Sequence, residues 1–195
     1  MASRQLNQAL RDAAKAGDLE KVRNYLASGA EINAGHWYYG DTPLHSAASG
    51  GHLNIVQLLL ERTDIDPNKE NKAGETLLHL ATKGRHFNIL QLLLERTDID
   101  PNRENKYGDT TLHIATIYEH LDIVQLLLGR TDIDPNKVNK SGKTPLFSAV
   151  LNRDIEIVQS LLNRTDVDPN EKNTVCSMYY QPLKRQMALS VKHKL

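Results

Sequence analysis

The sequence predicts an all-α fold, an array of helix pairs stacked in series. One observation is a motif that recurs in steps of 34 residues. A second is the helical spacing of apolar residues around it, which is typical of helices with one buried face. A third is near identity between copies, since residues 57–68 and 91–102 read the same letter for letter. The motif reads Gly-Glu-Thr-Leu-Leu-His in one copy, and its copies begin at Gly40, Gly74, Gly108 and Gly142.

The chain begins with a helix pair that lacks the motif. Residues 5–16 carry apolar side chains on one helical face, and Gly17 breaks the run. Asp18 then stands where it can cap a second helix. We expect this first unit to be atypical, because a terminal unit of an array faces water on one side.

Each later unit also reads as two helices. In the second unit, Thr42 stands at the N-cap and Pro43 at the first helical position, where its missing N–H costs nothing. Small residues on the first helix, Ala47 and Ala48, let the more apolar second helix, residues 53–60, approach closely. The predicted division of this single array is a capping unit at 1–34, repeats at 35–68, 69–102, 103–136 and 137–170, and a degenerate C-terminal cap or tail at 171–195.

Composition and charge narrow the possible functions. The 24 basic and 24 acidic side chains cancel, which argues against nucleic acid as a partner, because phosphates need a basic face. No apolar run approaches the roughly 20 residues that span a bilayer, and the N-terminal residues lack the apolar core of a secretory signal. A single cysteine, Cys176, suits a reducing compartment. We therefore expect a cytoplasmic protein that does not insert into membranes.

Three sequence features together resemble the ankyrin repeat, a unit of about 33 residues. They are the segment Thr42-Pro43-Leu44-His45 with the glycine before it, the Leu-Leu-Leu end of the second helix, and the Asp-Pro-Asn turn. The resemblance covers residues 5–183. It implies antiparallel helix pairs with short β-hairpin fingers, stacked into a curved ankyrin-repeat solenoid, and a role in binding other proteins.

Two departures from the family pattern concern helix ends. In later units, the usual Gly-Ala after the second helix is replaced by Arg-Thr-Asp-Ile, which is one residue longer. We expect the additional residue to let the chain leave the helix without a left-handed glycine. Gly51, which follows a first helix, becomes Arg85, Glu119 and Arg153 in later copies. We expect a local loss of stability of about 1 kcal/mol or less at each, with no change of fold.

Three histidines in phase, His45, His79 and His113, raise the question of a metal site. Neighbouring helices lie about 8–10 Å apart, whereas zinc ligands lie about 2 Å from the ion. Successive copies therefore cannot share a metal. We predict instead that each imidazole hydrogen-bonds within its own turn, to the capping threonine. Phe147 in the fourth copy agrees with a packing role for this position.

Aspartates after the second helix have the ligand spacing of a calcium loop, Asp64, Asp66 and Asn68, followed by Glu75. Lys69 stands where the sharp turn of such a loop requires glycine. We predict that these aspartates form Asx bonds to the local backbone instead. The sequence also shows no Gly-rich phosphate loop and no nucleophile paired with a base. We therefore predict no metal, no cofactor and no enzymatic activity.

Recognition is then expected at positions that differ between copies, because the positions that repeat are required by the core. By the family resemblance, the concave face is built from finger tips and from the exposed side of each first helix. Trp and Tyr are enriched among binding hot spots. The expected partner-binding residues are Trp37, Tyr38, Tyr39, Lys72, Lys106, Tyr107, Ile117, Tyr118, Leu151 and Asn152.

Two alternatives stay open for these residues. Trp37 can instead fold back onto the first helix pair and shield it from water. Lys72 and Lys106, which are in phase with Lys140, form either a basic ridge or an ordinary solvated face.

The sequence thus predicts a non-enzymatic, monomeric interaction module that binds a partner protein through its concave face. An alternative is a bacterial effector delivered into a host cytosol, whose array binds a host target while residues 179–195 recruit a second partner. A third is an inhibitor that occludes a kinase or a transcription factor.

Overall fold

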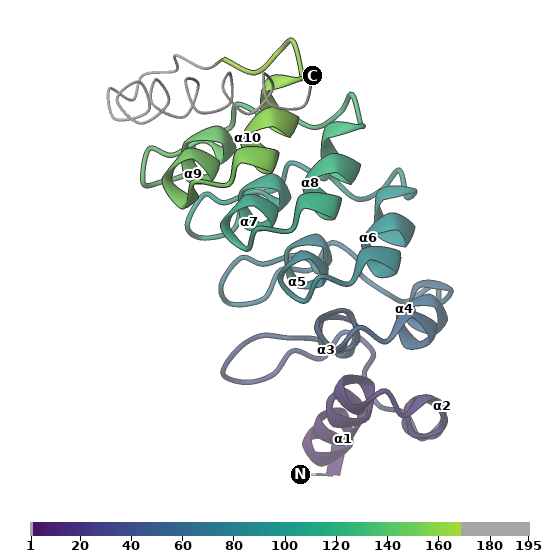
Figure 1. Ribbon diagram of the computed structural model, residues 1–195. Helices are drawn as coiled ribbons and strands as arrows, with labels where there is room; N and C mark the ends of the chain where they lie inside the picture. Colours follow the sequence, from purple (N-terminus) through teal and green to yellow (C-terminus); the bar gives the residue numbers. More distant parts are fainter. Residues whose placement is uncertain (1, 169–195) are drawn as a thin grey trace. The chain divides into compact units, whose positions relative to one another are not determined.

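The computed structural model describes residues 2–168, which form ten helices. The chain divides into two compact units, Met1–Lys106 (unit 1) and Tyr107–Leu195 (unit 2). The described part of each unit consists of helix pairs, as the sequence predicts: a short turn joins the two helices of a pair, and a longer finger leads from one pair to the next (Figure 1). Within that part of the chain, no helix combines the length and the apolar composition needed to cross a bilayer.

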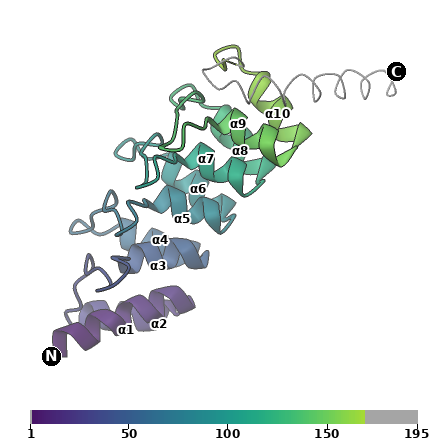
Figure 2. The same cartoon turned by 90° about the vertical axis from the view of Figure 1, so that its left-hand side faces the viewer.

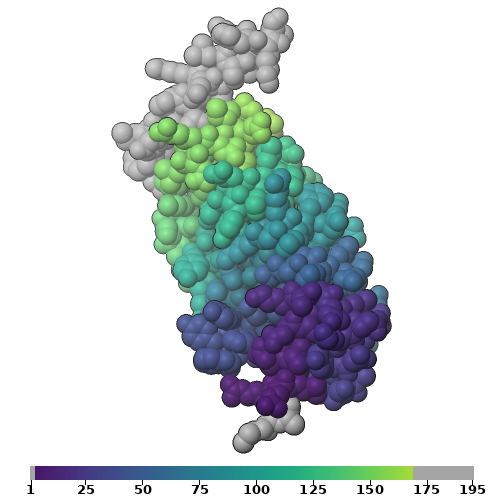
Figure 3. Space-filling view, turned by 60° about the horizontal axis from the view of Figure 1, so that its bottom comes forward, coloured from purple at the N-terminus to yellow at the C-terminus, as the bar shows by residue number. Residues whose placement is uncertain are grey.

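Unit 1 has two layers of helices. The first helices of successive pairs, α1, α3 and α5, pack on one another (Figure 2), and α2, α4 and α6 form the second layer beside them (Figure 1). Figure 3 looks toward the N-terminal end, where the purple surface of the first pair faces the reader with no other helix over it. The helices are α1 (Ala2–Ala16), α2 (Leu19–Ala27), α3 (Pro43–Gly50), α4 (Leu53–Leu60), α5 (Leu77–Lys83) and α6 (Phe87–Leu94).

Unit 2 repeats this arrangement with two helix pairs. Its first helices, α7 and α9, pack on each other, as do its second helices, α8 and α10. Contacts between α7 and α8 and between α9 and α10 close each pair. The helices are α7 (Thr111–Ile117), α8 (Leu121–Leu128), α9 (Pro145–Asn152) and α10 (Ile155–Leu162).

Threonine caps begin the first helices, and buried apolar side chains hold the layers together. Thr42 and Thr144 each accept a hydrogen bond from the backbone N–H three residues further on. Behind the first of these caps, Ala47 and Ala48 are fully buried, so the neighbouring helices approach closely. The second helices supply the larger core side chains, which include Ile55, Leu59, Ile89, Leu93, Ile123, Leu127, Ile157 and Leu161.

The ends of the second helices confirm the expected exit without a left-handed residue. The C-cap residue of α4, Glu61, keeps right-handed dihedral angles, and the C-caps of α6, α8 and α10 do the same. The chain then turns at an Arg-Thr-Asp segment, in which Arg62 Nε donates to Asp64 Oδ1 at 3.0 Å. Arg96 and Asp98 repeat that ion pair. The additional residue of this segment therefore replaces the usual glycine exit.

Three first helices end with a side chain in the left-handed region of backbone space. Gly51 has a φ of 78°, and its counterparts Arg85, Glu119 and Arg153 have φ values of 55°, 59° and 59°. A residue with a Cβ atom costs about 1–2 kcal/mol in this conformation. The loss of glycine here is therefore a source of local strain, and the helix pairs keep their fold, as expected.

The fingers between helix pairs are tight turns, not the β-hairpins that the family resemblance implies. No strand is present in residues 2–168. In one finger, two backbone bonds span the turn, from Asn71 N–H to Glu75 O at 3.0 Å and from Gly74 N–H to Asn71 O at 2.9 Å. One backbone bond joins this finger to the finger before it, from Lys72 N–H to Tyr39 O at 2.8 Å. These bonds close the turns but do not continue into the repeating ladder of a strand.

Candidate functional site

Four aromatic side chains at the tip of the first finger form the finger-tip cluster: His36, Trp37, Tyr38 and Tyr39. Ring centroids lie 4.8 Å apart for Tyr38 and Tyr39, and 5.3 Å apart for His36 and Tyr39. The cluster is nevertheless open to solvent, and Trp37 is 65% exposed. The three aromatic residues expected here thus lie together, and His36 completes the group.

Hydrogen bonds hold the backbone of the finger-tip cluster. Nδ1 of His36 accepts from the N–H groups of Tyr38 and Tyr39, at 3.2 Å each. From the next finger, Lys72 Nζ donates to Trp37 O at 2.7 Å. Because these bonds already fix the turn, a partner that binds the rings has little backbone to order.

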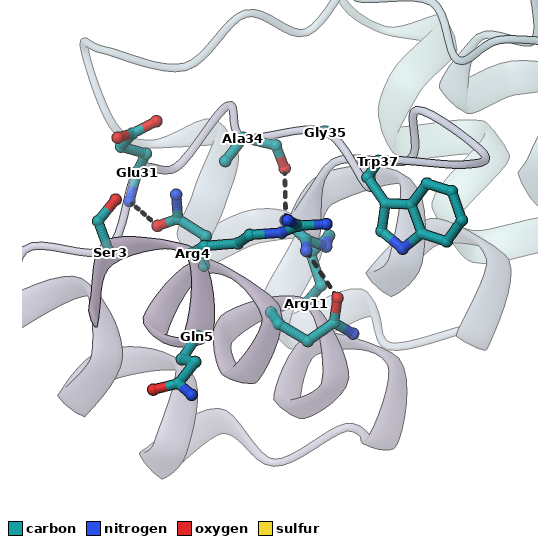
Figure 4. Close-up of a pocket in the computed structure, with 10 residues that line it drawn as sticks. Ser3, Arg4, Gln5, Arg11, Glu31, Ala34, Gly35 and Trp37 are labelled. Atoms are coloured by element: carbon teal, nitrogen blue, oxygen red, sulfur yellow. Dashed lines mark hydrogen bonds between the residues drawn. The ribbon is translucent and has the colours of Figure 1, made fainter. Parts of the chain in front are cut away.

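The sequence leaves open whether Trp37 binds a partner or folds back onto the first helix pair, and its position has features of both. Most of its surface is exposed, yet its indole also forms a wall of a pocket beside α1, next to Ala34 and Gly35 (Figure 4). That pocket has a volume of about 470 Å³. Trp37 therefore does not seal the first helix pair, because an open space remains between the indole and the helix.

Four of the predicted residues line one groove in unit 2. Tyr107, Ile117, Leu151 and Asn152 lie around a cavity of about 360 Å³. Tyr107 is 67% exposed, and Ile117 and Leu151 are each 41% exposed. Besides Asn152, the polar lining consists of Asp109, Asn139, Ser141, Lys143 and Ser148. The groove therefore combines three apolar side chains with polar groups of the kind that fix the orientation of a ligand.

The remaining predicted residues lie elsewhere. Tyr118 is outside the groove of unit 2, beyond the end of α7, where its ring centroid is 6.0 Å from that of His120. Lys72 holds the first finger through its bond to Trp37, so its amine has a structural contact as well as a solvated surface. Lys106 is exposed, and its backbone N–H donates to Ala73 O at 2.9 Å.

The in-phase histidines cap helices, as predicted. Thr42 N–H donates to Nδ1 of His45 at 3.2 Å, and Thr42 Oγ1 lies 2.8 Å from the same nitrogen. The caps around His79 and His113 have the same geometry. Since Nδ1 accepts a backbone N–H, the neutral ring carries its proton on Nε2. Burial lowers the pKa of His45, so the neutral form is favoured at pH 7.

The aspartates with calcium-loop spacing form turns, also as predicted. Oδ1 of Asp66 accepts from Asn68 N–H at 3.1 Å, and Asp100 and Asp134 make the equivalent bond in later copies. Asp64 is paired with Arg62. Among the described residues, no group of three or more potential metal ligands comes together.

Two side chains have an exposure that was not expected from the sequence. Val138 is an exposed apolar side chain where the in-phase residues of earlier copies, Glu70 and Glu104, are acidic. Comparing the copies at that position would have identified it. Arg11 is buried on α1, where later copies carry the capping histidine. Apart from this alignment with the capping histidines, nothing in the sequence indicates that Arg11 is buried.

Comparison with known proteins assigns a family to most of the chain. A family model described as ankyrin repeats in three copies matches residues 10–105 and 97–173. The 2-5A-dependent ribonuclease of Mus musculus is 38% identical over 68 residues, which is 35% of this chain. The L-asparaginase of Dirofilaria immitis is 42% identical over 67 residues, or 34%. Alpha-latrotoxin-Lhe1a of Latrodectus hesperus is 36% identical over 62 residues, or 32%.

The chain spans only a small part of each of these relatives. The matched segments make up 9% of the ribonuclease, 11% of the asparaginase and 4% of the latrotoxin. The two enzyme names therefore describe proteins of which this chain resembles a short stretch. Residues 179–195, for which the sequence suggests a recruiting role, lie outside the described residues.

Proposed function

The chain belongs to the ankyrin repeat family, whose repeats indicate a protein–protein interaction module, and on this premise we propose that it binds a partner protein through two surfaces. One is the finger-tip cluster of unit 1. The other is the groove of unit 2, around Tyr107, Ile117 and Leu151. The role requires no catalytic step of the chain's own.

The finger-tip cluster is the observation that carries the proposal. Three large aromatic residues, Trp37, Tyr38 and Tyr39, are exposed on one turn and pack mainly on one another. Monomeric proteins rarely expose such patches without a binding role. Trp and Tyr are also the residues whose truncation most often costs about 2 kcal/mol or more of binding energy.

Preorganisation supports the same assignment. The bonds from the backbone to His36 and from Lys72 to Trp37 O fix the tip before any partner arrives. Ordering a free side chain at an interface costs about 0.5–1.5 kcal/mol. Contact with a tip that is already ordered avoids part of this cost, so a modest aromatic surface can still support specific binding.

The groove of unit 2 is proposed as a second contact for the same partner class. Its apolar walls are Tyr107, Ile117 and Leu151, and Lys143 stands at its polar side. An apolar side chain of a partner fits such a groove, since burial of an apolar side chain contributes about 1.5–3 kcal/mol.

The test is capture from cell lysates by the full chain, quantified by mass spectrometry. A double variant, Trp37→Ala with Tyr107→Ala, removes the largest ring of each surface. Tyr25→Ala on α2 is the matched control, since it removes a ring from the second helix layer. We expect partners retained by the wild type and by Tyr25→Ala to bind the double variant more than about ten-fold more weakly, while its thermal midpoint barely moves. A large loss of stability with unchanged capture would refute the proposal.

A further inference from the structure

A pocket beside Trp37, here called the N-terminal pocket, lies between the start of α1 and the first finger. Figure 4 shows Arg11 reaching into it from the helix, with Ala34 and Trp37 on the side of the finger. Its volume of about 470 Å³ is large enough for a side chain. It is continuous with the finger-tip cluster, because Trp37 belongs to both.

Arg11 is a buried cation whose acceptors are both neutral. The residue is only 6% exposed. One terminal nitrogen donates to Ala34 O at 3.1 Å, and the other donates to Gln8 Oε1 at 2.8 Å. Nε has no acceptor among residues 2–168. Within that range, no carboxylate forms an ion pair with this guanidinium.

Burial of an arginine without a carboxylate is unfavourable, because the charge loses water and gains no counter-charge. Burial accordingly lowers the pKa of Arg11, and the nearby charge of Asp12 offsets this only in part. Arginine nevertheless stays protonated at neutral pH. The N-terminal pocket therefore holds a positive charge that neutral groups satisfy incompletely.

The fold does not require a cation at this position. In the next copy the in-phase residue is His45, whose pKa burial lowers and which caps its own helix through Thr42. The first unit has no such threonine, since α1 is one unbroken helix through this position. In the next copy, the neutral side chain of His45 fills the equivalent site. The charge of Arg11 therefore points to a role beyond packing.

Other residues of the pocket favour an anionic ligand. Arg4 also lines it, seven residues before Arg11 and therefore on the same face of α1. Glu31 lines it too, but Figure 4 shows its carboxylate pointing away from Arg11. The backbone N–H of Glu31 is already used, since it donates to Asn7 Oδ1 at 2.8 Å. Two cations thus share the pocket with an aromatic wall.

We infer that the N-terminal pocket binds the carboxylate of an aspartate or glutamate side chain of the partner protein, whose adjacent residues contact Trp37. This inference rests on the proposed function and specifies the chemistry of the partner. Guanidinium and carboxylate are planar groups that pair through two parallel hydrogen bonds. Because Arg11 is almost buried, a small planar group reaches it more readily than a tetrahedral phosphate does.

The experiment selects peptides of twelve residues from a random display library on the full chain. Each selected peptide is then synthesised in three forms: as selected, with its acidic residues changed to the matching amides, and with phosphoserine in their place. Affinity is measured for the wild type, Arg4→Gln, Arg11→Lys and Trp37→Ala. Arg23→Gln, an exposed arginine on α2, is the matched control.

We expect the amide form to bind the wild type about ten-fold more weakly or worse, since it removes the charge that pairs with the buried guanidinium. Arg4→Gln and Arg11→Lys should weaken the acidic form and leave the amide form unchanged. Arg23→Gln should bind as the wild type does. A circular dichroism melt checks that Arg11→Lys is folded. A shift of the Arg11 Nε–H resonance when acidic peptide is added would place the carboxylate at this side chain.

Three results would overturn the inference. Equal affinity for the acidic and amide forms shows that no carboxylate is recognised. Tighter binding of the phosphoserine form assigns the pocket to phosphate. Sensitivity to Trp37→Ala without sensitivity to either arginine variant leaves the finger-tip cluster as a docking surface and removes the pocket. If Trp37→Ala also has no effect, the proposed function of the cluster fails as well.

Discussion

Nδ2 of Asn71 donates to Oδ1 of Asp41 at 2.9 Å and so joins the bases of two successive fingers in unit 1. Oδ1 of the same side chain accepts from the N–H groups of Ala73 and Glu75, at 2.8 and 3.0 Å. Unit 2 has the same link between its own fingers. One amide therefore shapes its own turn and also ties it to the turn before.

Replacing this amide should loosen the fingers. Asn71→Ala leaves two backbone N–H groups without their acceptor, and we expect it to lower the free energy of unfolding by about 2 kcal/mol. Asn88→Ala, at an exposed position on α6, should change stability by less than about 0.5 kcal/mol. Urea denaturation followed by circular dichroism measures both. Equal effects of the two variants would contradict a structural role for the amide.

Restoring glycine at a left-handed helix end should stabilise the protein. Arg153 has a φ of 59°, and relief of roughly 1–2 kcal/mol of strain exceeds the added chain entropy of about 0.4–1 kcal/mol. We therefore expect Arg153→Gly to raise the free energy of unfolding by about 0.5–1 kcal/mol. Arg153→Ala keeps the strain and should give no such gain. A gain of the same size from alanine would mean that the arginine side chain, and not the backbone, is unfavourable.

Replacing a left-handed glycine by a residue with a Cβ atom should destabilise the protein. Gly51 has a φ of 78°, and a Cβ atom placed there would lie 2.6 Å from the ring of His86. We expect Gly51→Ala to lower the free energy of unfolding by more than about 1 kcal/mol, since backbone strain and a steric clash add. Thermal unfolding of this variant beside the wild type measures the difference. An unchanged midpoint would contradict both contributions, since movement of the His86 ring relieves the clash but not the backbone strain.

His45 should make stability depend on pH below 7. Its pKa is lowered by burial, so the unfolded chain binds more protons at this position than the folded chain. Stability is then lost as pH falls below the ordinary histidine pKa, about 6.5. His45→Phe, which introduces the residue found at the in-phase position Phe147, should lose less stability than the wild type between pH 7 and pH 5.5. Parallel losses in the two proteins would exclude this histidine as the cause.

Lys83 compensates the partly buried carboxylate of Glu75. Burial raises the pKa of Glu75, but hydrogen bonds from Lys83 and Asn71 outweigh it and hold the pKa below its ordinary value. Because Lys83 is one-third exposed, we expect Lys83→Met to cost about 1–2 kcal/mol, less than the loss at a fully buried pair. The cost should begin to shrink below about pH 4.5, where the carboxyl group of the unfolded chain gains a proton, and it should vanish at lower pH, once the carboxylate of the folded protein is protonated as well. Urea denaturation at pH 7 and pH 4 tests this. A cost that does not change with pH would mean that the lysine contributes through packing.

The helices were predictable because a helix boundary identified in one copy of the repeat also applies to the other copies. Thr42 and Pro43 mark the start of one first helix. Because the motif recurs every 34 residues, the same positions predict where the other first helices begin. The fingers were harder, since a hairpin and a tight turn have similar residues. Whether one backbone bond or several form between the arms depends on how the helix pairs hold the ends of the finger, which no local pattern shows.

The candidate site likewise contains residues that the sequence predicts and one residue that it does not. Exposure of Trp37 and Tyr107 could be expected because those positions change between copies, and changes are tolerated away from the core. Arg11 could not be assigned by such a comparison. Its burial depends on how the first finger folds over α1, and its lack of a carboxylate partner depends on the direction of Glu31. Both are properties of the assembled structure.

One backbone hydrogen bond joins each finger of unit 1 to the next, from Lys72 N–H to Tyr39 O and from Lys106 N–H to Ala73 O. These bonds use main-chain atoms alone, so they do not depend on which side chains stand at the tips, whereas the bond from Lys72 Nζ to Trp37 O requires that lysine. The tips are therefore suitable positions for grafting. A sequence with a new specificity can replace residues there, and the backbone donor and acceptor that join neighbouring fingers of unit 1 remain in place.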